Sequence, residues 1–297
     1  MIRLTEIEGR KVEYLIKGNG EKTVAIMVGM GCSIYDWLNI IEDISQYANV
    51  IAIHRPGVGN SEPHIEGSTT AIASKDLYSL IKKLDIKEKI ILVGHSYGGL
   101  CVQHFSRLYP EKVEGAVLVD SSSVDGYKFN ELELPVSDEN ESDEAYINLW
   151  TTYSKYTKEQ LKDEIKPTLS KEELKLPYEI QQELLEFNIR PEFYRTQLSE
   201  LIDLRNGGKE IKSAGKFPNV PLKILIRDPE YSINQIIETY RVPREEAERV
   251  EELWQRLSKE LKELSNKSEL IIVENSDHCI NESRPDAVIA AIKELLI

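Results

Sequence analysis

The chain has 297 residues with 37 basic and 51 acidic side chains, a formal net charge of −14 and 41% hydrophobic residues, so it can bury a core. The acidic balance argues against general nucleic-acid binding, which needs a basic surface, and no apolar run approaches the ~20 residues of a membrane span. The first residues lack a signal-peptide layout and the three cysteines are widely spaced, so we expect a cytoplasmic protein without a disulfide framework.

Up to about residue 122, strand-like runs alternate with helix-like ones. The predicted strands are 12–16, 23–28, 49–53, 89–93 and 113–119. A Gly-Asn-Gly stretch at 18–20 joins the first two strands, which predicts a hairpin. Helical patterns occur at 36–47, 71–84 and 99–109. Alternation of this kind is typical of a parallel α/β sheet covered on both faces.

Residues 124–218 have a different sequence pattern. They lack strand-like runs and contain predicted helical segments with aromatic side chains. After them the α/β pattern resumes, with predicted strands at 222–226 and 269–273 and predicted helices at 244–264 and 285–296. The pattern therefore predicts one α/β domain, formed by residues 1–123 and 219–297, with a helical insertion at 124–218.

One motif, at residues 94–99, indicates a catalytic function. The predicted strand 89–93 runs directly into Gly94-His95-Ser96-Tyr97-Gly98-Gly99, which opens a helix. This is G-x-S-x-G between a strand and a helix, where the tight turn requires small residues on both sides of the serine. The turn exposes the serine hydroxyl near a helix N-terminus, which favours developing negative charge. The motif predicts that Ser96 is a nucleophile.

Further segments extend the pattern beyond this motif. They are Gly29-Met30-Gly31 with Trp37, then Arg55-Pro56-Gly57-Val58-Gly59-Asn60-Ser61, and Ser276-Asp277-His278 after the last predicted strand. With these segments the chain resembles the α/β-hydrolase superfamily along essentially its whole length. The resemblance implies an α/β-hydrolase fold, a helical cap at 124–218 after the sixth strand, and a nucleophile–acid–histidine mechanism.

The resemblance also implies roles for individual residues. Ser96 attacks an acyl carbon, and His278 takes its proton and passes it to the leaving group. The oxyanion donors are the backbone N–H groups of Tyr97, after the nucleophile, and Met30, in the loop after the third strand. Val28 stands where the family usually has a histidine, so that loop lacks the usual imidazole brace.

The acid of the triad is left open among Asp120, Asp228 and Glu230. The last two lie in the usual family site after the seventh strand, but the typical G-x-x-D pattern is absent there. Asp120 ends the sixth strand, as in those family members that carry Val-Asp-x-Ser at this point and a tryptophan, here Trp254, in a later long helix. Asp120 is ranked first and Asp228 second, and Arg227 is a possible ion-pair partner for Asp228.

The expected function is hydrolysis of a small or medium acyl substrate, with a carboxylic ester as first choice. An amide, a lactone or a carbon–carbon bond is the alternative within enzymes, and a non-catalytic ligand-binding member of the fold is the alternative of another class. Ser96 argues against dehalogenase and epoxide hydrolase chemistry, because those relatives use aspartate. We expect neither a cofactor nor a metal, since ligand spacing and nucleotide motifs are absent. These motifs encode neither the acyl length nor the oligomeric state.

Three further expectations concern residues near this site. His95 should pack within the turn, and Cys279 should be an inert thiol because a serine already occupies the nucleophile position. Two or three aromatic side chains of residues 124–218 should line the roof of the substrate pocket.

Overall fold

The computed structural model describes residues 2–137 and 142–297. Eight strands of these residues form one sheet in the order β1-β2-β4-β3-β5-β6-β7-β8. Their bounds are β1 (Ile2–Ile7), β2 (Arg10–Lys17), β3 (Thr23–Met27), β4 (Asn49–Ile53), β5 (Ile90–His95), β6 (Val113–Val119), β7 (Leu222–Arg227) and β8 (Ser268–Val273). Strands β3 to β8 are parallel, while β2 is antiparallel to both neighbours. The predicted fold class, a mostly parallel α/β sheet, is confirmed.

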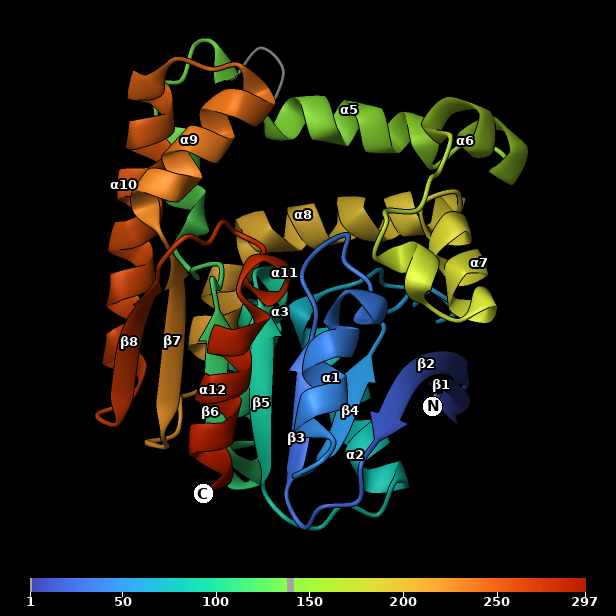
Figure 1. The fold of residues 1–297 in the computed structure, drawn as a ribbon, viewed down its shortest axis with the longest axis vertical. Helices are drawn as coiled ribbons and strands as arrows, with labels where there is room; N and C mark the ends of the chain where they lie inside the picture. The colour runs from blue at the N-terminus through green and yellow to red at the C-terminus, as the bar shows by residue number, and fades with distance from the viewer. Residues whose placement is uncertain (1, 138–141) are drawn as a thin grey trace.

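Helices cover both faces of the sheet (Figure 1). Helices α1 (Leu38–Ile44) and α12 (Pro285–Leu296) pack on one face, and α2 (Thr70–Lys83) and α3 (Tyr97–Leu108) on the other. Buried side chains of β3, β5 and β6 point alternately into these two apolar layers, which explains why their sequences are apolar throughout. Within the part of the chain that is described, no helix is long and apolar enough to cross a membrane.

The predicted hairpin at the N-terminus is wrong. Strand β2 pairs with β1 on one side and β4 on the other, while β3 lies between β4 and β5. The turn that closes the real hairpin is Glu8-Gly9, where both residues have positive φ, as a two-residue hairpin turn requires. The prediction missed β1 because its sequence, Ile2–Ile7, is half charged or polar at an exposed sheet edge.

Two helical excursions leave the sheet at its carboxyl edge. Between β6 and β7 lie α5 (Asp143–Tyr153), α6 (Lys158–Ile165), α7 (Tyr178–Phe187) and α8 (Pro191–Ser213), preceded by the 3-10 helix η3 (Gly126–Glu131). Helix α8 runs across the upper edge of the sheet and α5 lies above it (Figure 1). Between β7 and β8 lie α9 (Pro229–Tyr240) and α10 (Arg244–Glu260). Helix α9 was not predicted from the sequence.

Most aromatic side chains of the helical insertion at 124–218 form a separate small core. Phe187, Phe193 and Tyr194 are buried against Val58, with Trp150, Tyr153 and Tyr156 packed around them. The ring centroids of Phe187 and Phe193 are 5.0 Å apart in an edge-on arrangement. These side chains therefore hold the helical insertion together and attach it to the loop after β4.

A buried Ser–His–Glu set lies at the end of β4, away from Ser96 in the sequence. His54 Nδ1 is 2.7 Å from Glu13 Oε2, and His54 Nε2 is 3.3 Å from Ser33 Oγ. The N–H of Ile34 donates to the same His54 Nε2 at 3.0 Å, and Ser33 Oγ accepts the N–H of Tyr35. Because His54 Nε2 is already occupied as an acceptor, we interpret this set as a structural support for the 3-10 helix η1 (Ile34–Trp37).

Glu13 gives a stability prediction. Its burial disfavours the charged form, but hydrogen bonds from His54 and Asn60 outweigh this and lower its pKa from 4.5 to about 2. A lowered pKa in the folded state stabilises the fold above pH 4.5, and this stability is lost as the pH falls toward 2. We expect Glu13→Gln to lower the free energy of unfolding at pH 7 by about 3 kcal/mol, measured by urea unfolding.

The pH dependence tests the cause of this loss. The difference between wild type and Glu13→Gln should shrink as the pH falls from 5 to 2, because protonated Glu13 contributes no more than glutamine. Glu62→Gln is the matched control, since the Glu62 carboxylate accepts the N–H of Lys11 in an exposed hydrogen bond. A difference that stays constant over this pH range would contradict the prediction.

Candidate active site

Ser96 lies between β5 and α3 in a strained backbone conformation. Its φ is 52° and its ψ is −121°, a region that side-chain-bearing residues rarely adopt. The flanking glycines are required sterically, because a Cβ on Gly98 would lie 2.0 Å from the Met27 carbonyl oxygen and one on Gly94 would lie 2.5 Å from the Gly98 carbonyl oxygen. Ser96 is partly exposed at the carboxyl end of β5. This is the geometry that the motif predicts.

Sheet pairing brings Asp120 beside the serine turn. His95 at the end of β5 pairs with Val119 at the end of β6, and the Ser96 N–H donates to the Val119 carbonyl at 3.2 Å. Asp120 is the next residue after Val119 and is completely buried. Ser96 and Asp120 therefore lie at neighbouring strand ends.

His278 binds Asp120. His278 Nδ1 lies 2.7 Å from Asp120 Oδ2. The other carboxylate oxygen, Oδ1, accepts the indole N–H of Trp254 at 2.9 Å and the backbone N–H of Arg227 at 3.1 Å. The Arg227 guanidinium lies 3.4 Å from Asp120 Oδ2. Both carboxylate oxygens are thus fixed, and the carboxylate in turn holds the imidazole of His278.

The surroundings keep Asp120 ionised. Burial alone would raise the pKa of this carboxyl, but the charge of Arg227 and the hydrogen bonds from His278 and Trp254 lower it below its ordinary value. The guanidinium of Arg227 also lies 4.4 Å from the centroid of the Trp254 ring, and that ring contacts His278 edge-on at 5.1 Å. Arg227, Trp254 and His278 therefore form one packed group around the carboxylate.

The other candidate acids lie elsewhere. Asp228 Oδ1 accepts the N–H groups of Glu230 and Tyr231 and so caps the N-terminus of α9, while its Oδ2 accepts the N–H of Asn275 at 3.0 Å. Glu230 pairs with Arg244 in an exposed ion pair. Asp228 is a helix cap here, as its position directly before Pro229 explains. The proposed pairing of Arg227 with Asp228 is also not what the structure has, since Arg227 binds Asp120 and Glu251.

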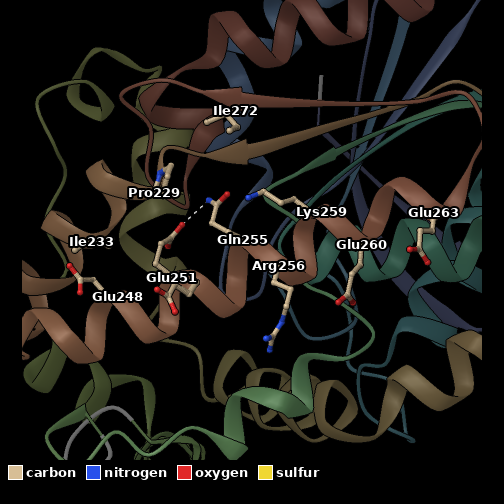
Figure 2. A pocket seen from close by; sticks show the side chains of 11 residues that line it. Pro229, Ile233, Glu248, Glu251, Gln255, Arg256, Lys259, Glu260, Glu263 and Ile272 are labelled. Atoms are coloured by element: carbon tan, nitrogen blue, oxygen red, sulfur yellow. Dashed lines mark hydrogen bonds between the residues drawn. The ribbon is translucent and has the colours of Figure 1, made fainter.

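Arg227 is held from behind by α10. Its guanidinium donates to Glu251 Oε2 at 2.6 and 2.8 Å, and Gln255 donates to Glu251 Oε1 at 2.8 Å. Figure 2 shows Glu251 and Gln255 pointing toward one another along a groove of about 780 Å³ on the outer side of α10. Charged side chains such as Glu248, Lys259 and Glu263 line this groove, and none of its described lining residues is a candidate catalytic group.

Two backbone N–H groups near Ser96 have no acceptor among the residues that the structure describes. Tyr97 is the first residue of α3, so its N–H has no partner within the helix. In the described residues the N–H of Met30, in the loop after β3, also has no hydrogen-bond partner. These are the two groups that the resemblance assigns to the oxyanion hole.

His95 has a definite contact. Its Nε2 donates to the backbone carbonyl of His278 at 2.9 Å, and the two imidazole rings are 4.8 Å apart. Burial and the neighbouring His278 lower the pKa of His95 to about 3, so it is neutral at pH 7. His95 thus ties the His278 backbone to the serine turn. Burial and nearby carboxylates raise the pKa of Cys279 to about 12, which disfavours its thiolate.

A cavity of about 510 Å³ opens beside His278. Trp254 and Cys279 also line it. The rest of its wall comes from η3 and the residues after it, α5, the end of β7, α9, the residues between α9 and α10, α10 and the loop after β8: Phe129, Leu134, Ser137, Tyr146, Arg227, Ser232, Gln235, Ile236, Thr239, Tyr240, Val242, Val250 and Asp277. Two cap aromatics, Phe129 and Tyr146, belong to the wall, whereas α9 and α10 supply more of it. Ser96 is not among these residues.

Comparison with known proteins identifies the family of this chain. A family model described as the alpha/beta hydrolase fold matches residues 18–200, more than half of the chain, so the chain belongs to the alpha/beta hydrolase family. A solved thermophilic esterase from Thermogutta terrifontis has a similar fold, with a TM-score of 0.61 and 19% identity over 99% of this chain and 96% of its own.

Two relatives are similar over part of their length. The dihydrolipoyllysine-residue acetyltransferase component of the acetoin cleaving system of Cupriavidus necator is 29% identical over 39% of this chain and 31% of its own length. The pimeloyl-[acyl-carrier protein] methyl ester esterase of Wigglesworthia glossinidia brevipalpis is 33% identical over 37% of this chain and 40% of its own length. The aligned segment thus spans less than half of each relative.

Part of this site is not evident from the sequence. The resemblance points to Trp254 only as a family feature, and no sequence pattern indicates that its indole binds Asp120. The roles of Arg227 and Glu251 were also missed, because the contact between them joins β7 to α10 through side chains alone. The available signal was the position of the two charges. Arg227 directly follows an apolar predicted strand and Glu251 lies within the predicted helix 244–264, and charges that become buried need partners.

Proposed function

We propose that this chain is a serine hydrolase that cleaves a carboxylic ester through an acyl-enzyme, with Ser96 as nucleophile, His278 as base and Asp120 as the acid. The observation that carries the proposal is the hydrogen bond between His278 and a buried, ionised Asp120, set at the strand end next to the serine turn. The family membership supports this reading, and the esterase among its relatives favours an ester over other acyl substrates.

The mechanism follows from these contacts. His278 Nδ1 donates to Asp120, so Nε2 is free to take the proton of Ser96 Oγ as that oxygen attacks the ester carbonyl carbon. The negative charge that develops on the carbonyl oxygen is stabilised by the N–H groups of Met30 and Tyr97. His278 then protonates the leaving alcohol. In the second half of the reaction, water attacks the acyl carbon while His278 takes its proton, and His278 returns that proton to Ser96 Oγ as the acid product leaves.

The cavity beside His278 supports a neutral substrate. Among the described residues of its wall, Arg227 is the one permanent cation, and it is already paired with Glu251 and Asp120. A substrate carboxylate would enter without a partner, which is costly in a partly buried site. We therefore propose that the cavity takes the uncharged acyl or alcohol group of a medium-sized ester, adjacent to the reacting carbonyl.

Covalent labelling tests the proposed activity. We expect a fluorophosphonate probe to label the native protein at Ser96, located by mass spectrometry of peptides, and neutral activated esters to be hydrolysed faster than esters of dicarboxylic acids. Absence of both labelling and hydrolysis would favour a non-catalytic ligand-binding protein. Labelling with hydrolysis of lactones or amides but not of esters would shift the substrate class.

The cavity wall gives a prediction about chain length. Val250 on α10 lines the cavity, so Val250→Trp should fill part of it. We expect kcat/KM for octanoate esters to fall by at least about tenfold, because added volume excludes the longer chain, while acetate esters change little. The measurement is kcat/KM over a series of p-nitrophenyl esters.

Glu252→Trp is the matched control for this prediction. Glu252 is exposed on the same helix and lines the outer groove instead of the cavity, so both ester lengths should react as in the wild type. An equal loss for acetate and octanoate in Val250→Trp would contradict the assignment of the cavity.

A further inference from the structure

The loop that carries the Met30 N–H is bound by a buried arginine from elsewhere in the chain. Arg55, in the loop after β4, is 2% exposed. Its Nη1 donates to the carbonyl of Val28, and its Nη2 donates to the carbonyl of Gly29 at 2.8 Å. The carbonyl of Gly29 also accepts the N–H of Cys32, at 3.3 Å. Arg55 thus supplies the brace that Val28 itself does not.

The direction of the Met30 N–H follows from the contact with Gly29. The Gly29 carbonyl and the Met30 N–H belong to one planar trans peptide unit, so they point in opposite directions. When Arg55 fixes the Gly29 carbonyl, it also fixes the Met30 N–H on the other side. A loop with glycines at 29 and 31, the latter at a φ of 71°, would otherwise have much conformational freedom.

The arginine is in turn held by the cap. Glu200 on α8 is completely buried and binds Arg55 with both oxygens, Oε1 to Nε at 2.5 Å and Oε2 to Nη2 at 3.0 Å. A buried ion pair is often no better for stability than an apolar pair of the same size, so its presence points to a role in positioning. Ser68 also donates to Glu200, at 2.8 Å.

The same helix also holds the second oxyanion residue. Asp203 follows Glu200 by three positions, so both lie on one face of α8. The hydroxyl of Tyr97 donates to Asp203 at 2.6 Å, and the Arg55 guanidinium lies 5.2 Å from the centroid of the Tyr97 ring. Contacts from one helix face therefore reach Tyr97 directly and, through Arg55, the peptide unit that carries the Met30 N–H.

We propose that Arg55 and Glu200 are positioning residues that set the Met30 N–H for oxyanion binding, so that cap helix α8 acts on the chemical step itself. This inference rests on the proposed hydrolase function. It makes α8 a part of the catalytic scaffold, whereas the outer helices α5 to α7 form the remainder of the cap. The pair should contribute to stabilisation of the transition state and little to binding of the substrate.

A double replacement by apolar residues tests this role with the least risk to folding. In Arg55→Met/Glu200→Met both charges are removed together, so neither is left buried without a partner. We expect kcat for a p-nitrophenyl ester to fall by about 100-fold, the loss typical of one oxyanion donor, with KM within about threefold of wild type. The affinity for a trifluoromethyl ketone, which forms a tetrahedral adduct with the serine, should fall by a similar factor.

Two single variants sharpen the result. Arg55→Lys keeps the charge, but its three N–H donors lie on one nitrogen and cannot replace the four hydrogen bonds that Arg55 makes from three nitrogens. We therefore expect it to lose most of the same kcat. Ile202→Ala, an exposed position on α8, should retain wild-type kcat and KM. Urea unfolding of each variant measures its stability, and if the double variant does not fold, Arg55→Lys decides by the same kcat and KM criteria.

The outcomes separate the two proposals. Wild-type protein that neither hydrolyses esters nor reacts with the fluorophosphonate overturns the proposed function and this inference with it. An active wild type together with folded Arg55 variants that keep full kcat and ketone affinity overturns the inference alone. A loss that appears in KM while kcat is unchanged also overturns it, because the pair would then act on substrate binding.

Discussion

Replacing Ser96 by alanine is expected to abolish ester hydrolysis, with kcat reduced by about 10⁶-fold. Every other group of the proposed site would remain, but no nucleophile would be present to form the acyl-enzyme. The fold should be intact, because the Ser96 side chain makes no capping hydrogen bond to α3. Alanine also carries a Cβ, so the backbone strain at this position should be similar in the variant and the wild type. Initial rates with an activated ester, together with fluorophosphonate labelling, measure the effect.

A second serine provides the control for this variant. Ser106 is buried in the same helix, α3, and its hydroxyl has no partner among the described residues. Ser106→Ala should therefore keep wild-type turnover and labelling. Turnover by Ser96→Ala at the wild-type rate would show that another residue is the nucleophile.

Replacing Asp120 by asparagine is expected to lower kcat by about 10⁴-fold. The amide is neutral and presents N–H as well as oxygen, so it no longer holds His278 in the tautomer whose Nε2 accepts a proton from Ser96. Trp254 and the Arg227 backbone N–H can still donate to the asparagine oxygen, and Arg227 retains Glu251 as its partner. The measurement is kcat, with urea unfolding as a check on stability.

Asp228→Asn is the matched variant for the other candidate acid. Asparagine caps a helix about as well as aspartate, so α9 should keep its N-terminus and kcat should stay within about threefold of wild type. If Asp228→Asn lost activity and Asp120→Asn kept it, the acid would be Asp228, and the observed bond between His278 and Asp120 would have another purpose.

The proposed role of α8 leads to different expectations for two kinds of substitution in the helical insertion. A substitution on the buried face of α8 reaches the loop after β3 and Tyr97, through Glu200 and Asp203. A substitution near the 510 Å³ cavity changes its wall, as at Tyr146. The first kind should act on kcat, and the second kind on the preference among esters.

Local sequence determined the parallel strands β3 to β8, the helices on the two faces of the sheet and the serine turn. Apolar β-branched runs such as 113–119 can be buried on two faces only as parallel strands, and this strand has the predicted bounds. The serine turn is also local, because its strain and the need for Gly98 depend on adjacent elements. The predicted N-terminal hairpin was wrong because its two strands, β2 and β3, pair with other strands of the sheet. The periodicity of a single strand does not encode which strand it pairs with.

Only the tertiary structure decided which carboxylate meets His278 and what braces the loop after β3. Asp120 and His278 are 158 residues apart, and Arg55 and Glu200 are 145 apart. Sequence patterns report the period and propensity of neighbouring residues, whereas these contacts form where separate elements end at one edge of the sheet. Asp228 resembled a catalytic acid by its position in the sequence. In the structure, α9 begins directly after Asp228, and the Asp228 carboxylate accepts the N–H groups at the N-terminus of that helix.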